Sequence, residues 1–440
     1  MLGKVEQHIL QQTHKSGSVP GFVFRTRQRH HSDQRKRGMC LMRILKKTLT
    51  LLPLLALPAL LGAQESRQVT FGGQARPRFE SRTPVNESWN SGTSMRIRAS
   101  LNARLEGSVR VFIQLQDVRF FGEEDNTLTD FQADNFDLHQ GFLELTDVPS
   151  LGGTFRVGRQ ELALGEQRLV GAVDWAQQGR SFDGFRYTKQ SRGGFNVDLF
   201  AMKLREDPSG AGDWESSFLG AYGTVPLGKV GSVDVFGLFT TDTREDNGSE
   251  VTFGGLWKGR AGPVDLGLEG SLQTGKRDGI DVSAFMFGAR AGAKVHESTT
   301  VTLWYDHLSG DDDLEDEEIG VFSTLFATNH AFYGFADYFL NIPVHTGGLG
   351  LRDAAVKLAF KLSPKTGLKV DLHNFQSAQK GYLSTHSLAS EVDLTLTYRF
   401  SRALTVMSGY SYVQAKDGIK ELDRLSENAQ WVYVMLNAAF

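Results

Sequence analysis

The sequence has little cysteine or proline and only one strongly apolar run. Cys40 is the only cysteine among 440 residues, so a chain that begins after residue 63 has neither a disulfide nor a lipid-carrying N-terminal thiol. The apolar run, residues 49–61, contains Pro53 and Pro58 and is shorter than the roughly 20 residues of a membrane-spanning helix. A hydrophobic fraction of 40% is too low for a helical membrane protein, and the even spread of apolar and aromatic residues excludes a disordered chain.

The apolar run has the parts of a secretory signal peptide. Arg43, Lys46 and Lys47 precede it, and small residues ending at Ala63 follow it. We therefore predict a signal peptide over residues 42–63, cleaved after Ala63. Residues 1–41 are basic and patternless, and we interpret them as an upstream extension from a misassigned start; a basic arm that binds nucleic acid is the alternative. Residues 64–440 carry an excess of Asp and Glu, which argues against nucleic acid as a partner.

Most of residues 68–440 alternate between apolar and polar with a period of two, and no helical period of convincing length occurs. Residues 94–106 show the alternation best, since Ile97, Leu101 and Leu105 fall on the face opposite Arg96 and Arg98. A soluble β-sandwich would show the same alternation, so this pattern alone establishes strands and no more.

The lengths of the connections distinguish a membrane barrel from a sandwich. Short turns occur at Gly107 and near residues 149–151, 191–193, 259–262, 363–365 and 401, whereas residues 120–136, 162–180, 309–350 and 414–427 form long connections. Short turns at one end and long loops at the other are typical of outer-membrane barrels. We predict that residues 64–440 form an all-β, transmembrane antiparallel β-barrel of about 18 strands, with 16 still open. The last strand ends at Phe440 and resembles the signal read by the barrel assembly machinery.

Arginines occupy the predicted inner face of the early strands. If the apolar side chains face lipid, the lumen receives Arg76, Arg78, Arg96, Arg98, Arg104, Arg110, Arg156 and Arg186. Guanidinium groups match carboxylates and phosphates in bidentate geometry, so this lining predicts a pathway for anionic solutes. The alternative is that these arginines pair with inward carboxylates such as Glu80, Glu106, Asp117 and Glu144 and only brace the wall.

Several short motifs resemble the alginate export family of outer-membrane porins. They are Gly158-Arg159-Gln160, Arg168-Leu169-Val170-Gly171, Trp175, Gly179-Arg180-Ser181-Phe182-Asp183-Gly184, Asn329-His330, Gly334 and Asp337-Tyr338-Phe339. The resemblance implies an 18-stranded barrel with an arginine-rich constriction that passes a polyuronate or a similar anion. It implies that Arg159, Arg168 and Arg180 lie near the extracellular half of the pore, with Asp183 as a countercharge. The alternative is a packing motif that holds a loop inside the barrel.

The segment that begins the longest connection is acidic. Carboxylates at Asp311, Asp312, Asp313 and Asp316 could supply oxygen ligands to Ca²⁺, although no loop of the EF-hand type is present and a solvated acidic run is commoner. The aromatic residues that follow, from Phe322 to Phe339, are too apolar for a free loop, so we predict that they fold into the barrel or pack on its rim.

These observations predict a porin or channel of the bacterial outer membrane that passes anionic solutes and exports an acidic polysaccharide such as alginate. Uptake of small anions and a plugged structural barrel are the alternatives. A hydrolase is disfavoured, because His139, His307, His330, His373 and Ser387 show no catalytic spacing. The expected partners are outer-membrane lipid, lipopolysaccharide, the barrel assembly machinery and the anionic cargo. No cofactor is expected other than calcium at the acidic segment.

Overall fold

Long antiparallel strands account for most of the residues that the computed structural model describes, which are 68–85, 88–105, 107–122, 136–206, 215–243, 248–313 and 316–440. The predicted extension over residues 1–41 and the predicted signal peptide over residues 42–63 lie outside the described residues. Among the described residues, no helix has the length and apolar character needed to cross a membrane.

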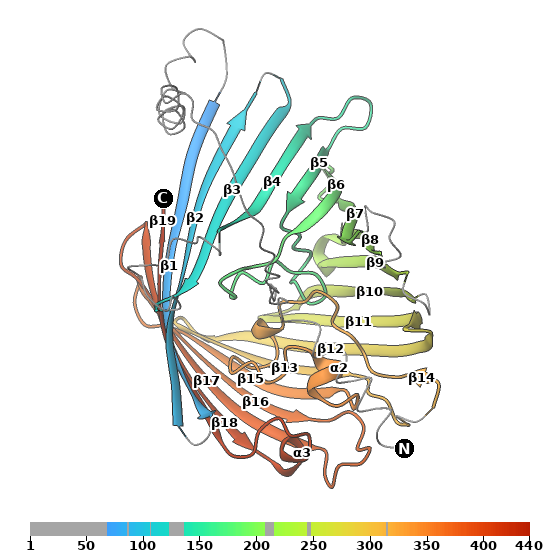
Figure 1. The fold of residues 1–440 in the computed structure, drawn as a ribbon, viewed down its shortest axis with the longest axis vertical. Helices are drawn as coiled ribbons and strands as arrows, with labels where there is room; N and C mark the ends of the chain where they lie inside the picture. Colours follow the sequence, from blue (N-terminus) through green and yellow to red (C-terminus); the bar gives the residue numbers. More distant parts are fainter. Residues whose placement is uncertain are drawn as a thin grey trace, which may run out of the picture. The chain divides into compact units, whose positions relative to one another are not determined.

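Eighteen strands of the described chain form one continuous wall (Figure 1). They are β1 (Gln68–Val85), β2 (Ser88–Arg104), β3 (Val109–Phe120), β4 (Phe136–Thr146), β5 (Thr154–Gln160), β6 (Phe182–Gln190), β7 (Asn196–Arg205), β8 (Ser216–Pro226), β9 (Ser232–Asp242), β10 (Gly248–Ala261), β11 (Val264–Arg277), β12 (Ile280–His296), β13 (Thr299–Leu308), β15 (Leu351–Lys361), β16 (Thr366–Gln376), β17 (Ser387–Arg399), β18 (Leu404–Ala415) and β19 (Ala429–Ala439).

The remaining elements are short. The two-residue strand β14 (Glu318–Ile319) pairs in parallel with β12. It is not one of the wall strands, because β13 pairs directly with β15. The short helices are η2 (Gly228–Val230), η3 (Asn329–Ala331), α2 (Ile342–His345) and α3 (Asp417–Glu421).

The wall closes on itself through the pairing of β1 with β19. This seam runs from Gln74 opposite Ala439 to Thr83 opposite Gln430, and the Gln74 side-chain amide donates to Asn437 Oδ1 at 2.7 Å across it. Closure removes the free sheet edges, which hydrocarbon cannot hydrogen-bond. The structure therefore confirms the predicted 18-stranded antiparallel barrel.

The two faces of the wall differ as a lipid-facing barrel requires. The outer face is apolar and exposed: the Phe71 side chain is 77% exposed, and Leu268 and Phe285 lie on the same outer surface. The inner face is polar, and Arg96 on β2 is 0% exposed. Because side chains alternate between the faces of a strand, the period of two in the sequence produces this separation directly.

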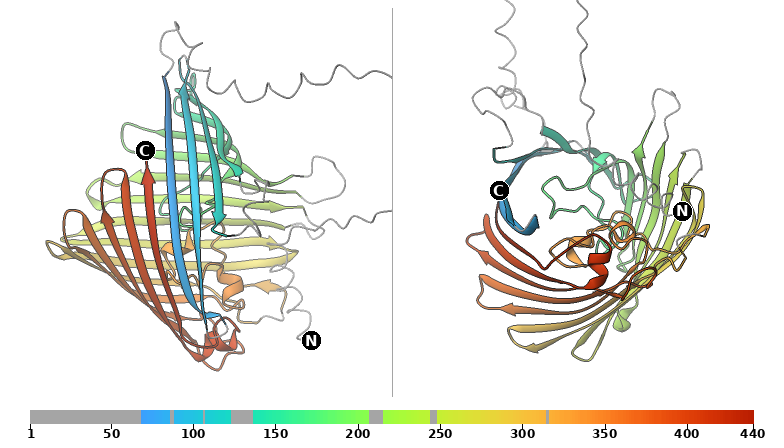
Figure 2. Two further views of the ribbon diagram at one scale, coloured as in Figure 1. Left: turned by 60° about the vertical axis from the view of Figure 1, so that its left-hand side comes forward. Right: turned by 60° about the horizontal axis from the view of Figure 1, so that its bottom comes forward.

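The connections at one end of the barrel are short turns, and those at the other end include two long loops that turn inward. Residues 161–181 connect β5 to β6, and residues 309–350 connect β13 to β15. Figure 2 shows both loops inside the ring of strands. Most aromatic residues of the second loop are buried, as their apolar character predicts, and Phe339 packs on Phe375 of β16 with ring centroids 4.6 Å apart. The interior of this barrel is therefore a packed constriction rather than an empty lumen.

Candidate functional site

Three arginines on the inner faces of β1 and β2 hold the β5–β6 loop. Arg76 donates to the backbone carbonyl oxygens of residues 174, 175 and 176 at 2.6, 3.2 and 2.8 Å. Arg96 donates to Asp174 Oδ1 at 2.8 Å, and Arg98 reaches the same oxygen at 3.4 Å. Planar guanidinium groups present several donors in a fixed geometry, so they match a turn whose carbonyls point at the wall. These three cations act as a clamp on the loop.

The loop backbone approaches the clamp closely at Gly179. This residue has φ +67, which an L side chain rarely adopts, and a Cβ atom there would lie 2.7 Å from Arg98 Nη2. Gln177 supports the same contact from the loop side, since its amide donates to Ser94 Oγ at 2.9 Å and accepts from Arg76 Nε at 3.0 Å. The glycine and the glutamine therefore fit the loop to the arginines.

Arg168 fixes the same loop to the opposite part of the wall, on β11 and β13. It donates to both carboxylate oxygens of Asp306 at 2.6 and 3.1 Å and to Glu269 Oε2 at 3.2 Å. Its guanidinium also lies 4.2 Å from the centre of the Phe332 ring. Burial alone would lower the pKa of Arg168, but the Asp306 and Glu269 carboxylates outweigh burial and raise that pKa. Arg168 therefore stays charged in its buried position.

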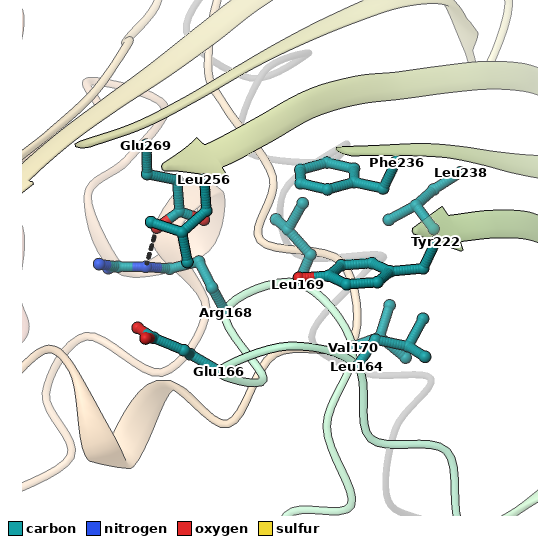
Figure 3. Close-up of a pocket in the computed structure, with 10 residues that line it drawn as sticks. All are labelled: Leu164, Glu166, Arg168, Leu169, Val170, Tyr222, Phe236, Leu238, Leu256 and Glu269. Carbon is teal, nitrogen blue, oxygen red and sulfur yellow. Dashed lines mark hydrogen bonds and ion pairs between the residues drawn. The ribbon is translucent and has the colours of Figure 1, made fainter. Parts of the chain in front are cut away.

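The tip of the β5–β6 loop packs on β8–β11 beside Arg168 (Figure 3). Leu164, Leu169 and Val170 face a wall surface formed by Tyr222, Phe236, Leu238 and Leu256. The cavity left between them is only ≈ 20 Å³, about the space of one water probe. Glu166 pairs with Arg290 of β12 at the edge of this contact. Apolar packing and ion pairs thus both fix the loop tip to the wall.

The two inward loops are joined to each other by backbone hydrogen bonds. Gly171 N donates to Phe326 O at 2.8 Å, and Phe326 N donates to Leu169 O at 2.9 Å. The Arg180 guanidinium donates to the Phe326 carbonyl from the other side. The two loops therefore form one connected constriction.

Carboxylates on β17 hold the β13–β15 loop. Ala336 N donates to Glu391 Oε1 at 2.8 Å, and Phe335 N donates to Asp393 Oδ2 at 3.3 Å. Gly334 has φ +81, and a Cβ atom there would lie 2.5 Å from the Glu391 carboxylate, so only glycine fits this approach. Acceptors on the wall therefore bind backbone donors of this loop, whereas donors on the wall bind backbone acceptors of the β5–β6 loop.

A stack of flat groups lies where the two loops meet the wall. Trp175 stacks on His330 with centroids 4.3 Å apart, and His330 stacks on Phe335 at 4.8 Å. The Arg78 guanidinium covers the Trp175 ring at 4.7 Å and donates to the Trp175 carbonyl at 2.8 Å. The stack links both loops to β1.

Two hollows lie between the loops and the wall. One of ≈ 690 Å³ lies against β6–β10 and is lined in part by Arg186, Asp198, Asp234 and Lys258. The other, of ≈ 400 Å³, lies against β13 and β15–β17 beneath His330 and Phe335. Both hollows are lined by charged and polar side chains of the inner wall.

The arginines predicted for the lumen divide into three groups. Arg76, Arg78, Arg96 and Arg98 bind the β5–β6 loop, and Arg78 also pairs with Glu80 at 2.9 Å, as the bracing alternative predicts. Arg110 and Arg156 share Glu144 at 3.0 and 2.5 Å, and Arg186 binds Asp198 at 2.5 Å, all on the inner wall. Arg104 is exposed at the end of β2. Direct contact of any of them with an anion stays a prediction.

Two residues predicted for the pore face the wrong way. Arg159 of β5 and Asp183 of β6 are paired at 2.8 Å, but they lie on the outer face. Asp183 is opposite Lys203 of β7, and the inward positions of that strand include the buried Phe200 and Met202. The pairing of the two charges is as the resemblance implies, while their place in the solute pathway is corrected, since strand alternation points them outward.

The described part of the acidic segment, residues 311–313 and 316–318, shows no assembled cation site. Asp311 accepts from the backbone of Asp313 at 3.2 Å and of Gly320 at 3.3 Å, and burial raises the pKa of the Asp311 carboxyl. Asp312, Asp313 and Asp316 are exposed. Within the described residues, no group of three or more His, Cys, Asp or Glu residues could hold a metal ion. Calcium binding here stays a prediction.

His139 lies between a carboxylate and a hydroxyl, as in a hydrolytic triad. Its Nε2 is 2.7 Å from Glu161 Oε1 and its Nδ1 is 3.4 Å from Ser181 Oγ. The imidazole is only 2% exposed, and Glu161 also faces Arg98 at 3.5 Å. Through Glu161, the buried imidazole is therefore joined to the arginine clamp.

The chain matches the model of the alginate export family over residues 67–432. It belongs to the alginate export family. No match is found among curated proteins. Among solved structures, Pseudomonas aeruginosa OccK3 (OpdO) is 14% identical over 84% of this chain and 95% of its own, with a TM-score of 0.58. Acinetobacter baumannii OccAB4 is 12% identical over 85% and 98%, with a TM-score of 0.58. Pseudomonas aeruginosa OpdK with vanillate is 13% identical over 84% and 98%, with a TM-score of 0.55.

At these identities the solved structures establish the barrel fold, and the family supplies the function. The alginate export family member described here is an outer-membrane channel for anionic solutes, and its apolar outer face contacts outer-membrane lipid. The family match also agrees with the resemblance seen in the motifs around Arg168 and Gly179.

Sequence reasoning missed the residues that act between distant segments. Asp306, Glu391 and Asp393 occupy polar positions of alternating strands, but their loop partners come from elsewhere in the chain. The lysines of the ≈ 400 Å³ hollow, Lys357 and Lys369, were also missed. The alternation of the strands predicts that both lysines face inward. The hollow could not be predicted in this way, because it depends on how the loops fold.

Proposed function

We propose that this channel exports an acidic polysaccharide of the polyuronate class through the constriction formed by its two inward loops. The family match over residues 67–432 carries the proposal. The inner wall supports it, because cations line both hollows, Arg186 and Lys258 in the larger and Lys357 and Lys369 in the smaller, and such groups match carboxylates on a passing chain.

The clamp arginines serve this function by position rather than by direct contact. Their donors are occupied by carbonyls and by Asp174, so they hold the β5–β6 loop across the barrel. A barrel of this size without inward loops would be a wide aqueous pore. Loops fixed to the wall narrow the passage to the hollows and let side chains there select the solute.

Uptake of small organic anions is the second candidate. The observation that favours it is the dense packing of the constriction, in which Phe322, Tyr333 and Phe339 are almost fully buried. A passage narrowed in this way suits single small solutes as well as an extended chain. Neither function requires catalysis, and we propose none.

Lipopolysaccharide and the barrel assembly machinery are proposed partners of the outer surface. The Arg159–Asp183 pair and the Lys203–Glu215 pair, the latter at 2.6 Å, lie on the outer face near the long-loop end. The cations Arg159 and Lys203, at the long-loop end of the outer face, can contact the negatively charged phosphates of lipopolysaccharide. The terminal strand β19 supplies the apolar alternation that resembles an assembly signal.

Conductance in a planar bilayer tests the proposed function. The purified protein is reconstituted, reversal potentials are measured in asymmetric salt, and polyuronate oligomers or a neutral oligosaccharide are added to each side separately. We expect anion-selective current that the polyuronate blocks and the neutral sugar does not. Block by small organic anions without block by the polyuronate would instead favour the uptake channel.

A further inference from the structure

The ≈ 400 Å³ hollow combines side chains of three chemical kinds. Trp304 of β13 and Phe335 of the β13–β15 loop supply aromatic surface, Lys357 and Lys369 supply positive charge, and threonines of β13 and β17 supply hydroxyls. Its volume lies within the range of about 300–1,000 Å³ that is usual for small-molecule pockets. Most other cations of the inner wall described above are already paired with carboxylates or loop carbonyls.

The charge in the hollow is only partly neutralised. Lys357 Nζ lies 3.5 Å from Asp371 and 5.1 Å from the centre of the Trp304 ring, and its side chain is 17% exposed. Lys369 is exposed, and the structure pairs it with no carboxylate among the described residues. The hollow is therefore lined by one ammonium group over an aromatic ring, that of Lys357, and by a second, that of Lys369, which has no carboxylate partner among the described residues.

The hollow continues toward the end of the barrel with the short turns. A third hollow, of ≈ 520 Å³, shares Thr300, Ala359, Lys369 and Thr397 with it and reaches the β15–β16 turn. It adds Lys361 at the end of β15, opposite Gly367 in the sheet. Because Ala359 is opposite Lys369, and Lys357 and Lys361 are opposite Asp371 and Gly367, Lys369 of β16 is the diagonal neighbour of both Lys357 and Lys361 of β15, so the three inward lysines alternate between the two strands. Such diagonal neighbours are about 7–8 Å apart.

We propose that this lysine diagonal (Lys357, Lys369 and Lys361), together with Trp304 and Phe335, is a binding subsite for consecutive sugar-acid units on the short-turn side of the constriction. The inference rests on the proposed function and deepens it. A row of cations at a regular step contacts successive carboxylates of one chain, whereas a single small anion contacts only one. The aromatic rings present an electron-rich face to the C–H groups of a sugar ring, and the threonine hydroxyls match its hydroxyls.

The test compares variants in the same bilayer assay, with polyuronate trimers added to the short-turn side. Lys369→Gln and Lys361→Gln each remove one ammonium from the diagonal, and Lys276→Gln is the matched control. Lys276 pairs with Asp281 at 3.0 Å at the far end of β11, away from the hollow, so it removes the same charge from the protein without touching the subsite. Heat-modifiable migration on gels verifies that each variant has formed its barrel.

We expect about a tenfold rise in the blocking Kd for each diagonal variant, the loss usual for one charge-assisted hydrogen bond, and a larger rise for the double variant. The control should keep the wild-type Kd. A linear polycarboxylate of equal charge should block the wild type more weakly, because it offers no ring to Trp304.

The outcomes separate the two proposals. Polyuronate block that is unchanged in the diagonal variants, or equally strong block by the linear polycarboxylate, would overturn the subsite and leave the export function standing. A wild-type channel that polyuronate fails to block from either side would overturn both.

Discussion

Replacement of Arg96 by Met tests whether the inward arginines are a loop clamp or a charged lining. Arg96 donates to Gln74 Oε1 at 2.7 and 3.0 Å and to Asp174 Oδ1 at 2.8 Å. Methionine fills similar space but donates nothing, so the loop loses its closest charged contact on β2. One such hydrogen bond is worth about 1.5–3 kcal/mol. The ratio of held to released loop should therefore fall by roughly tenfold to a hundredfold.

Single-channel recording detects this change directly. Release of residues 174–178 from the wall widens the passage, so Arg96→Met should show larger conductance and more open-channel noise than the wild type. Arg186→Met is the matched control, because Arg186 also faces inward but binds Asp198 of the adjacent strand and no loop. Removal of charge is the same in both variants, and only the first loosens the loop.

The reasoning would be refuted by a particular pattern of results. If Arg96→Met keeps the wild-type conductance and noise while its anion selectivity falls as far as that of Arg186→Met, the arginines act as lining and the clamp has no energetic role. Deuterium exchange of the amides in residues 174–180 gives a second measure, since a released loop exchanges faster.

Three further outcomes are expected. Arg168→Met leaves Asp306 and Glu269 buried without their cation and should destabilise the protein by about 3–5 kcal/mol in denaturant unfolding, whereas adding Asp306→Asn should restore part of the loss. Gly334→Ala should release residues 335 and 336 from β17, because the new Cβ would collide with the Glu391 carboxylate. The release is measured as faster amide exchange at these two residues. Unchanged exchange would show that the close contact of residue 334 with Glu391 does not require glycine. Burial and Arg424 lower the pKa of His345 to about 4, so on acidification His345 of the unfolded loop binds a proton at a higher pH than His345 of the folded loop does. Acidification from about pH 6.5 to 4 should therefore loosen α2 and raise channel noise, and His345→Asn should abolish that dependence.

The sequence predicted what is local. Alternation over residues 94–106 was enough to place Arg96 and Arg98 inside and Ile97 outside, because a strand has only two faces. Alternating turn lengths were enough to predict a closed barrel. The same counting from Arg156, which faces inward, puts Arg159 outside, so the wrong assignment of Arg159 came from the motif resemblance and not from the strand pattern.

The partners of the constriction could not be predicted, because they depend on the three-dimensional path of two loops. Arg168 and Asp306 are 138 positions apart in the sequence, and Ala336 and Glu391 are 55 apart. Nothing in their spacing identifies these pairs. The resemblance did indicate that Arg168 and Gly179 matter, but the alternative of a packing motif describes their contacts better than direct contact with a solute.

The attachment of the loops has a consequence for the order in which the protein assembles. The β5–β6 loop is bound to β1 and β2 on one side and to β11 and β13 on the other, and Arg82 of β1 donates to Ala336 O of the second loop at 3.3 Å. Neither loop can reach these anchors until the sheet has curved through most of its circumference. We therefore expect the seam between β1 and β19 to close late, around an interior that is already filled.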